Sequence, residues 1–143
     1  MHKRMFAVLL PVLLAGCLSF ACKWHKSPAT GPLIVKASFI NKDGTAAAVP
    51  SNLHLVTIER DNKGELSSVV EHFGNIKMSP APGTKGGVGI EVPRDLVAKG
   101  GEFSFAFNAE GGFPAPLRKG EALLTFKVDA ATEQIDIGEI VLE

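Results

Sequence analysis

The sequence predicts an all-β fold, an antiparallel β-sandwich of about seven strands that follows an N-terminal signal and tether. Three observations lead to this prediction. From Leu33 onward, apolar residues recur with a period of two and not 3.6. The alternating segments are short, and turn-forming Gly, Pro, Asn and Asp residues separate them at fairly regular spacing. Only residues 94–99 have the pattern of a helical turn, which Gly100 and Gly101 would end.

The first half of the body contains three expected strands. Residues 33–40 alternate and end at the turn sequence of residues 41–44 (NKDG). Residues 53–60 form the second strand. A tight turn over residues 61–64 reverses the chain, because the glycine that ends it can adopt a left-handed conformation. Residues 66–73 then return along the second strand.

Three phenylalanines mark the clearest strand of the second half, which lies between expected strands at residues 88–92 and 122–128. Phe103, Phe105 and Phe107 share one face of this strand. Three large apolar side chains on one face of a monomer rarely all stay exposed. We therefore expect them to belong to the core. The expected packing partners from the facing sheet are Val35, Phe39 and Phe126.

The last strand is expected at residues 135–142, and two long loops precede it. The apolar positions of this strand change parity at Gly138, which predicts a β-bulge that returns the later side chains to the core face. Residues 74–87 and 109–120 are rich in glycine and proline and longer than most connections. Each is expected to be a loop that either crosses between the sheets or carries a function.

Composition and charge exclude several classes of function. The chain has 143 residues, with 15 basic and 15 acidic residues and no block of Lys or Arg. A nucleic-acid partner is therefore not expected. Tyr is absent and there is a single Trp, so tyrosine-based catalysis is excluded and stacked aromatic platforms are disfavoured. No EF-hand, P-loop, HExxH or CxxC motif is present, and we expect no cofactor.

The N-terminal segment has the regions of an export signal. Residues 1–4 include two basic side chains, and residues 5–15 are apolar. The wider run of residues 5–21 has 17 residues, is interrupted by Pro11 and Gly16, and is shorter than the roughly 20 residues of a spanning helix. Residues 14–17 (LAGC) resemble the lipobox of bacterial lipoproteins at all four positions.

The lipobox resemblance implies that cleavage follows Gly16 and that the sulfur of Cys17 carries diacylglycerol. The chain would then consist of a signal peptide (1–16), a lipidated flexible tether (17–32) and a β-sandwich domain (33–143). Two other interpretations remain open: an ordinary secretory signal with a later cleavage site, and an uncleaved anchor. All three place the domain outside the cytoplasm, and lipid on Cys17 would hold it at the membrane.

Leu18 and Cys22 bear on location and on crosslinking. In Gram-negative sorting rules, a residue other than Asp after the lipidated cysteine resembles the outer-membrane class. We therefore expect a lipoprotein of the outer membrane that faces the periplasm. With Cys17 lipidated, Cys22 has no intramolecular disulfide partner and is an idle thiol or an intermolecular crosslink. Cys22 and His25 also have the spacing of half a metal site.

Two histidines are candidates for a metal site on the sheet. Pairing about the 61–64 turn puts position 54 near position 71 or 72, so His54 and His72 would be cross-strand neighbours with Glu71 beside them. Such a face could bind zinc or copper. The alternative is a pair of histidines on a solvated sheet face. No Ser or Cys lies in a motif that would supply it with a base and an orienting acid.

The body of the chain resembles two families. The turn at residues 41–44, the Val49-Pro50 pair before the second strand and the closing residues 135–142 are similar to prealbumin-like sandwiches, also called transthyretin-like or carboxypeptidase regulatory-like. This resemblance implies a prealbumin-like sandwich, with an Ig-like one as the alternative. Residues 88–107 are similar to small sandwich lipoproteins of the pilotin type, which escort secretion-system subunits to the outer membrane.

These features predict a membrane-anchored cell-envelope lipoprotein whose non-catalytic β-sandwich binds a protein partner or supports an envelope assembly. The alternative is a periplasmic module that binds a metal or a small ligand through His54, His72 and the 74–87 loop. No residue pattern favours an enzyme over either of them.

Overall fold

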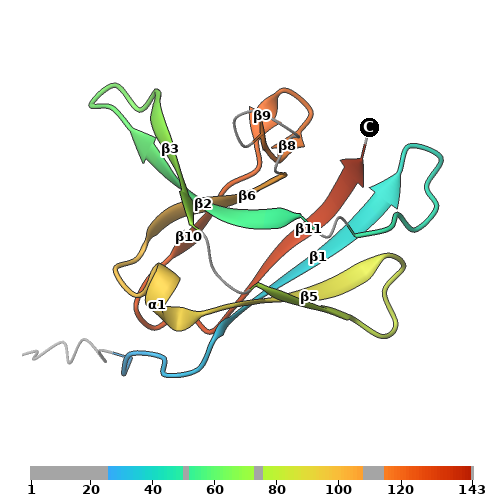
Figure 1. Ribbon diagram of the computed structural model, residues 1–143, viewed down its shortest axis with the longest axis horizontal. Coiled ribbons are helices and arrows are strands. Elements are labelled where there is room, and N and C mark those ends of the chain that lie inside the picture. Colours follow the sequence, from blue (N-terminus) through green and yellow to red (C-terminus); the bar gives the residue numbers. More distant parts are fainter. Residues whose placement is uncertain (1–25, 50–51, 73–75, 108–114, 143) are drawn as a thin grey trace, which may run out of the picture.

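The computed structural model describes residues 26–49, 52–72, 76–107 and 115–142. In this part of the chain, two β-sheets pack face to face and one short helix lies at an end of the sandwich (Figure 1). The elements, in chain order, are β1 Leu33–Asn41, β2 Leu53–Arg60, β3 Leu66–His72, β4 Lys77–Pro80, β5 Gly87–Val92, α1 Arg94–Val97, β6 Gly101–Phe107, β7 Ala115–Pro116, β8 Arg118–Lys119, β9 Ala122–Leu123, β10 Phe126–Val128 and β11 Gln134–Leu142. The predicted all-β sandwich is confirmed.

The first sheet, sheet A, has the strand order β11-β1-β5-β4. β1 pairs antiparallel with β5, and β5 pairs antiparallel with β4. β11, however, runs parallel to β1, with Ile34 opposite Gln134 and Asn41 opposite Leu142. The expectation of a fully antiparallel sandwich is wrong for this pair. β11 enters sheet A at the pole where β1 begins, and side-chain alternation carries no information about strand direction.

The predicted bulge at Gly138 is confirmed. Lys36 lies opposite Asp136 and Ala37 lies opposite Gly138, so Ile137 is the extra residue on β11. Gly138 has φ +74°, a conformation that favours glycine, and its amide donates a hydrogen bond to Asp136 Oδ1 at 2.8 Å. The bulge restores the parity of the strand. Apolar side chains on both sides of it pack against the core: Ile135, Ile137, Ile140 and Leu142.

The second sheet, sheet B, has the order β10-β6-β2-β3, and β7 adds to β6. The expected turn over residues 61–64 closes the β2–β3 hairpin. The Asp61 amide donates a hydrogen bond to the Glu65 carbonyl at 2.9 Å, and Gly64 has φ +80°. Figure 1 shows this hairpin projecting from the body of the sandwich at the upper left.

A second bulge lies beside this turn. Arg60 lies opposite Leu66, but Glu59 lies opposite Ser68, so Ser67 is the extra residue on β3. β3 itself contains no glycine, and its apolar residues Leu66, Val69 and Val70 follow no single parity from which a bulge could be predicted. From Ser68 onward, β3 is offset by one position along β2, and this offset decides which side chains share a face.

Aromatic and branched side chains fill the space between the sheets. Phe105 is 1% exposed, and the centre of its ring lies 5.4 Å from that of Phe126. Phe39 and Val35 come from the facing sheet and belong to the same buried cluster, as predicted. The prediction that Phe126 comes from the facing sheet is wrong. Phe126 lies on β10, which pairs with β6 in the same sheet. The phenylalanines of β6 are core residues, although Phe107 at the strand end is only half-buried.

Both segments expected to be loops contain short strands. β4 forms an edge of sheet A, and β7 adds two residues to β6. β8 and β9 make a small hairpin of their own (Figure 1). Strands of two to four residues are too short to show a period of alternation. The glycine and proline content of these segments therefore predicts loops and gives no indication of the short strands.

The helix α1 packs at the pole of the sandwich where β1 begins. Val97, its last residue, is 1% exposed. Gly100 follows with φ +69°, as expected for a glycine that ends a helical turn, and a Cβ there would lie 2.9 Å from the Val128 carbonyl oxygen. Within the described ranges, no helix is long and apolar enough to cross a membrane.

Candidate functional site

The residues that carry the export and lipidation predictions lie outside the described part of the chain. These residues are Gly16 and Cys17. Cys22 and His25, which carry the crosslink and half-metal-site predictions, also lie outside it. The described chain begins at Lys26, and it shows how the domain meets the segment that precedes it.

The last residues of the predicted tether are held against the domain. The Ala29 amide donates a hydrogen bond to the Ala130 carbonyl at 2.8 Å. Arg94 joins two further segments: its Nε donates to the Gly31 carbonyl at 2.7 Å, and its Nη1 donates to the Thr132 carbonyl at 2.8 Å. We call these three contacts the clasp. The clasp fixes the chain from Ala29 onward, a few residues before the predicted domain boundary.

The expected His/His/Glu face does not form. Glu71 lies opposite Val56, so His72 pairs with the residue before Val56 and not with His54. Paired residues of an antiparallel ladder share a face. His54 and Glu71 therefore lie on one face of sheet B, and His72 lies on the other. The cause is the bulge at Ser67, without which the ladder from the turn would place His54 opposite His72.

Each histidine has a different neighbour instead. His72 Nε2 shares a hydrogen bond with Thr57 Oγ1. His54 Nδ1 lies 3.7 Å from Glu71 Oε1, and that carboxylate oxygen is buried. Among the residues that the structure describes, no group of three or more His, Cys, Asp or Glu side chains could hold a metal ion. The two histidines make separate polar contacts in the sheet and do not form one ligand set.

An ion pair spans β2 and β6 of sheet B. Arg60 donates two hydrogen bonds of 2.8 Å to Glu102, one from Nε and one from Nη2. These bonds are the main reason that the pKa of Glu102 falls from 4.5 to about 2, and Thr125 and Lys127 contribute to the decrease. A carboxylate with this pKa stays ionised near neutral pH and cannot act there as a general acid.

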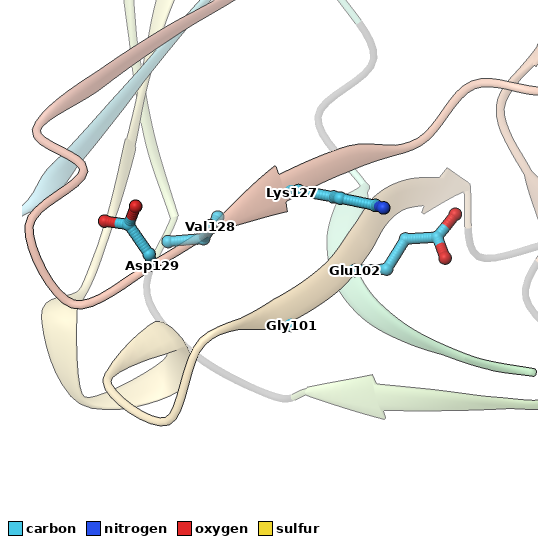
Figure 2. Close-up of a pocket in the computed structure, with 5 residues that line it drawn as sticks. All are labelled: Gly101, Glu102, Lys127, Val128 and Asp129. Atoms are coloured by element: carbon cyan, nitrogen blue, oxygen red, sulfur yellow. The ribbon is translucent and has the colours of Figure 1, made fainter.

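An open pocket of about 420 Å³ lies beside this ion pair, where β6 begins and β10 ends (Figure 2). Figure 2 shows the Lys127 ammonium directed toward the Glu102 carboxylate, whereas Asp129 points away from them. Asp129 Oδ1 accepts hydrogen bonds of 2.8 Å from Thr132 Oγ1 and from the Ala131 amide, which lower the pKa of Asp129. Both carboxylates of this pocket are engaged in structural contacts, so it is a poor candidate for acid–base chemistry.

A larger groove of about 570 Å³ opens at the opposite pole, between the end of β11 and the strands β7 and β8. We call it the distal groove. Its wall is mainly apolar and includes Phe107, Pro116, Leu117, Ile140, Val141 and Leu142. Lys42 and Arg118 also line it, and none of the lining residues that the structure describes is acidic. A mainly apolar wall with a few polar groups is typical of a site that binds a ligand or a partner.

Sequence reasoning missed both the clasp and the distal groove. Arg94 was expected only in a helical turn, and Phe107 was expected only in the core. The glycine and proline of residues 109–120 did mark this segment as a candidate, and its described part supplies one wall of the groove. The opposite wall comes from the end of β11, which no local pattern links to that segment.

The chain was compared with protein families, with curated proteins and with solved structures. No protein family matches it. No curated protein and no solved structure matches it either. The residues and geometry of this chain are therefore the basis of the function proposed below.

Proposed function

We propose that this protein is a membrane-anchored lipoprotein of the cell envelope whose β-sandwich binds a protein partner in the distal groove, without catalysis. The anchor is proposed from the sequence, with cleavage after Gly16 and lipid on Cys17. The proposed location is the outer membrane of a Gram-negative cell, facing the periplasm, because Leu18 follows the lipidated cysteine. The distal groove is the observation that carries the binding role.

The wall of the groove favours an apolar occupant. Leu117 and Ile140 are buried, and beside them Val141 is 51% exposed. Covering apolar surface contributes about 25 cal/mol per Å² of area removed from water. Exposed apolar surface next to a buried apolar wall is typical of a surface that binds a partner.

The charges of the groove define the rest of the partner. Lys42 and Arg118 are exposed cations, and the Arg118 Nη1 donates a hydrogen bond to the Glu121 carbonyl at 2.7 Å, which helps to fix the guanidinium. Within the described part of the lining these two cations face no acidic side chain, and such a surface favours a negatively charged occupant. The proposed partner therefore presents an apolar segment that carries an acidic residue.

The clasp places the attachment point of the tether at the pole opposite the distal groove. It holds the chain at the pole where β1 begins, and the groove lies at the pole where β1 ends. The nine residues of β1 separate these poles by roughly 26 Å. The twelve residue steps from Cys17 to Ala29 span at most about 43 Å when fully extended. Because the tether can be longer than this separation and attaches at the far pole, it leaves the groove accessible to a partner.

The polar side chains of the described sandwich also support a binding role. Glu102 is held by Arg60, and Ser104 is fully buried with its hydroxyl donating to the Leu124 carbonyl at 2.6 Å. A nucleophilic serine needs exposure and a neighbouring base. Among the residues of ranges 26–49, 52–72, 76–107 and 115–142, no His, Ser, Cys, Asp or Glu lines the groove.

Site-specific photo-crosslinking tests the groove in the full-length chain. A photoreactive amino acid at Val141, irradiated in the cells that make the protein, should form one discrete adduct with a protein partner. The double variant Lys42→Glu, Arg118→Glu should reduce the adduct at least roughly tenfold, because it replaces two attractive contacts with repulsive ones. The matched control Lys63→Glu, Lys99→Glu makes the same charge change at exposed positions outside the groove and outside the strands, and it should leave the adduct unchanged. An adduct that is insensitive to the groove charges would contradict the proposal.

A further inference from the structure

The edges of the two sheets are not equally protected. A free edge strand presents unpaired N–H and C=O groups to any second strand, and proteins usually block such edges with short strands, Lys, Pro, charges or bulges. Three of the four outer strands have these features. β4 has four residues with Lys77 and Pro80 at its ends, and β10 has three residues with Lys127 in the middle. β11 is interrupted by the bulge at Gly138, beside Asp136.

β3 is the least protected of the four, although it contains the charged Glu71 and a bulge of its own. It has seven residues without Lys or Pro, and its bulge lies near the turn, which leaves a regular run over residues 68–72. Among the described strands, it pairs only with β2. Leu66 and Val70 on its surface are 46% and 42% exposed, and Val141 of the distal groove is the other large apolar residue with comparable exposure in the described chain. An edge of this kind favours the addition of a strand.

The position of β3 leaves its free edge accessible. Figure 1 shows the β2–β3 hairpin reaching beyond the rest of the sandwich, away from β4 and β5 of sheet A. We propose that β3 pairs with β3 of a second copy of this chain in an antiparallel, two-fold arrangement. The pairing joins two copies of sheet B into one continuous sheet, with the two-fold axis at Val70.

The edge is complementary to itself in this arrangement. Val70 is the centre of the regular run, so the two-fold axis places Val70 beside Val70 of the second copy. The same register places Glu71 opposite Val69 of the second copy and Ser68 opposite His72. No two like charges face each other, an arrangement that would be destabilising. The exposed apolar side chain of Val70 instead gains an apolar, β-branched neighbour, which is a favourable cross-strand pair.

Disulfide crosslinking of the full-length chain in its membrane tests this register. In a Cys22→Ser background, Val70→Cys should give a covalent dimer of twice the chain mass under mild oxidation. Directly opposed residues of an antiparallel ladder have Cα atoms about 4.5–5.5 Å apart, which is within the reach of a disulfide. The background chain without an added cysteine accounts for any crosslink through Cys17.

Two control positions separate edge pairing from mere exposure. Leu66→Cys lies on the same strand with similar exposure, but the two copies of residue 66 would be roughly 26 Å apart across the axis, so it should give at least tenfold less dimer. Ser79→Cys lies exposed on the edge strand β4 and should also give at least tenfold less dimer. Absence of a dimer with Val70→Cys, equal yields at Leu66→Cys or Ser79→Cys, or an adduct with another protein would each overturn the proposal. The disulfide test probes β3 and the photo-crosslinking test probes the distal groove. Either proposal can therefore fail without the other.

Discussion

Phe105 is the residue whose replacement tests the core most severely. It is 1% exposed and lies opposite Leu55 on β2. The centre of its ring lies 5.4 Å from the centre of the Phe126 ring. Replacing a buried Phe with Ala costs about 3–5 kcal/mol in well-packed cores. The lost ring contact alone is worth about 0.5–1.5 kcal/mol. Since single domains have free energies of unfolding of about 5–15 kcal/mol, Phe105→Ala should remove a fifth or more of the stability.

Urea denaturation followed by far-UV circular dichroism measures this loss. The chain can be secreted with Leu18 as its first residue, which retains every contact of the two sheets and the clasp. Val141→Ala is the matched control, because Val141 is 51% exposed and its truncation should change the free energy of unfolding by less than about 0.5 kcal/mol. An unchanged urea midpoint for Phe105→Ala would refute the reasoning, because the phenylalanines of β6 would then form an interaction surface and not the core.

Two further predictions concern the ion pair and a turn. The pKa of Glu102 is lowered from 4.5 to about 2 by Arg60, so the stabilisation by the ion pair is present above pH 4.5 and is lost as the pH falls toward 2. Relative to Glu102→Gln, the unmodified chain should therefore lose stability over this range in urea titrations, and a stability difference that is independent of pH would argue against the ion pair. Gly86→Ala should lower the free energy of unfolding by about 1–3 kcal/mol, because Gly86 has φ +65° and an added Cβ would collide with the Phe39 carbonyl oxygen. Gly31→Ala is its control, with nothing within 4 Å of the added Cβ, and equal thermal midpoints for the two variants would contradict the account.

The strands and one bulge of this fold were predictable because they depend on local patterns. Alternation located β1, β2 and β6, since one face of each strand is buried against the other sheet. The parity change around Gly138 located the bulge on β11, since the apolar side chains must return to the core side.

The features that were not predictable depend on contacts between distant segments. The parallel pairing of β11 with β1 is set by where the chain crosses between sheets, and alternation is the same for either direction. The bulge at Ser67 has no signal of its own, yet it moves His54 and His72 to opposite faces. The distal groove brings Lys42, Arg118 and the end of β11 together from three separate parts of the sequence.

Lipid attachment at Cys17 is the central claim, and metabolic labelling tests it directly. Cells that make the full-length chain are grown with a clickable palmitate analogue, and the labelled chain is detected in the membrane fraction. The account predicts strong labelling of the unmodified chain and of the control Cys22→Ser, and loss of the label in Cys17→Ala, because the thioether and the new N-terminus both belong to Cys17. Equal labelling of Cys17→Ala and the unmodified chain would contradict it.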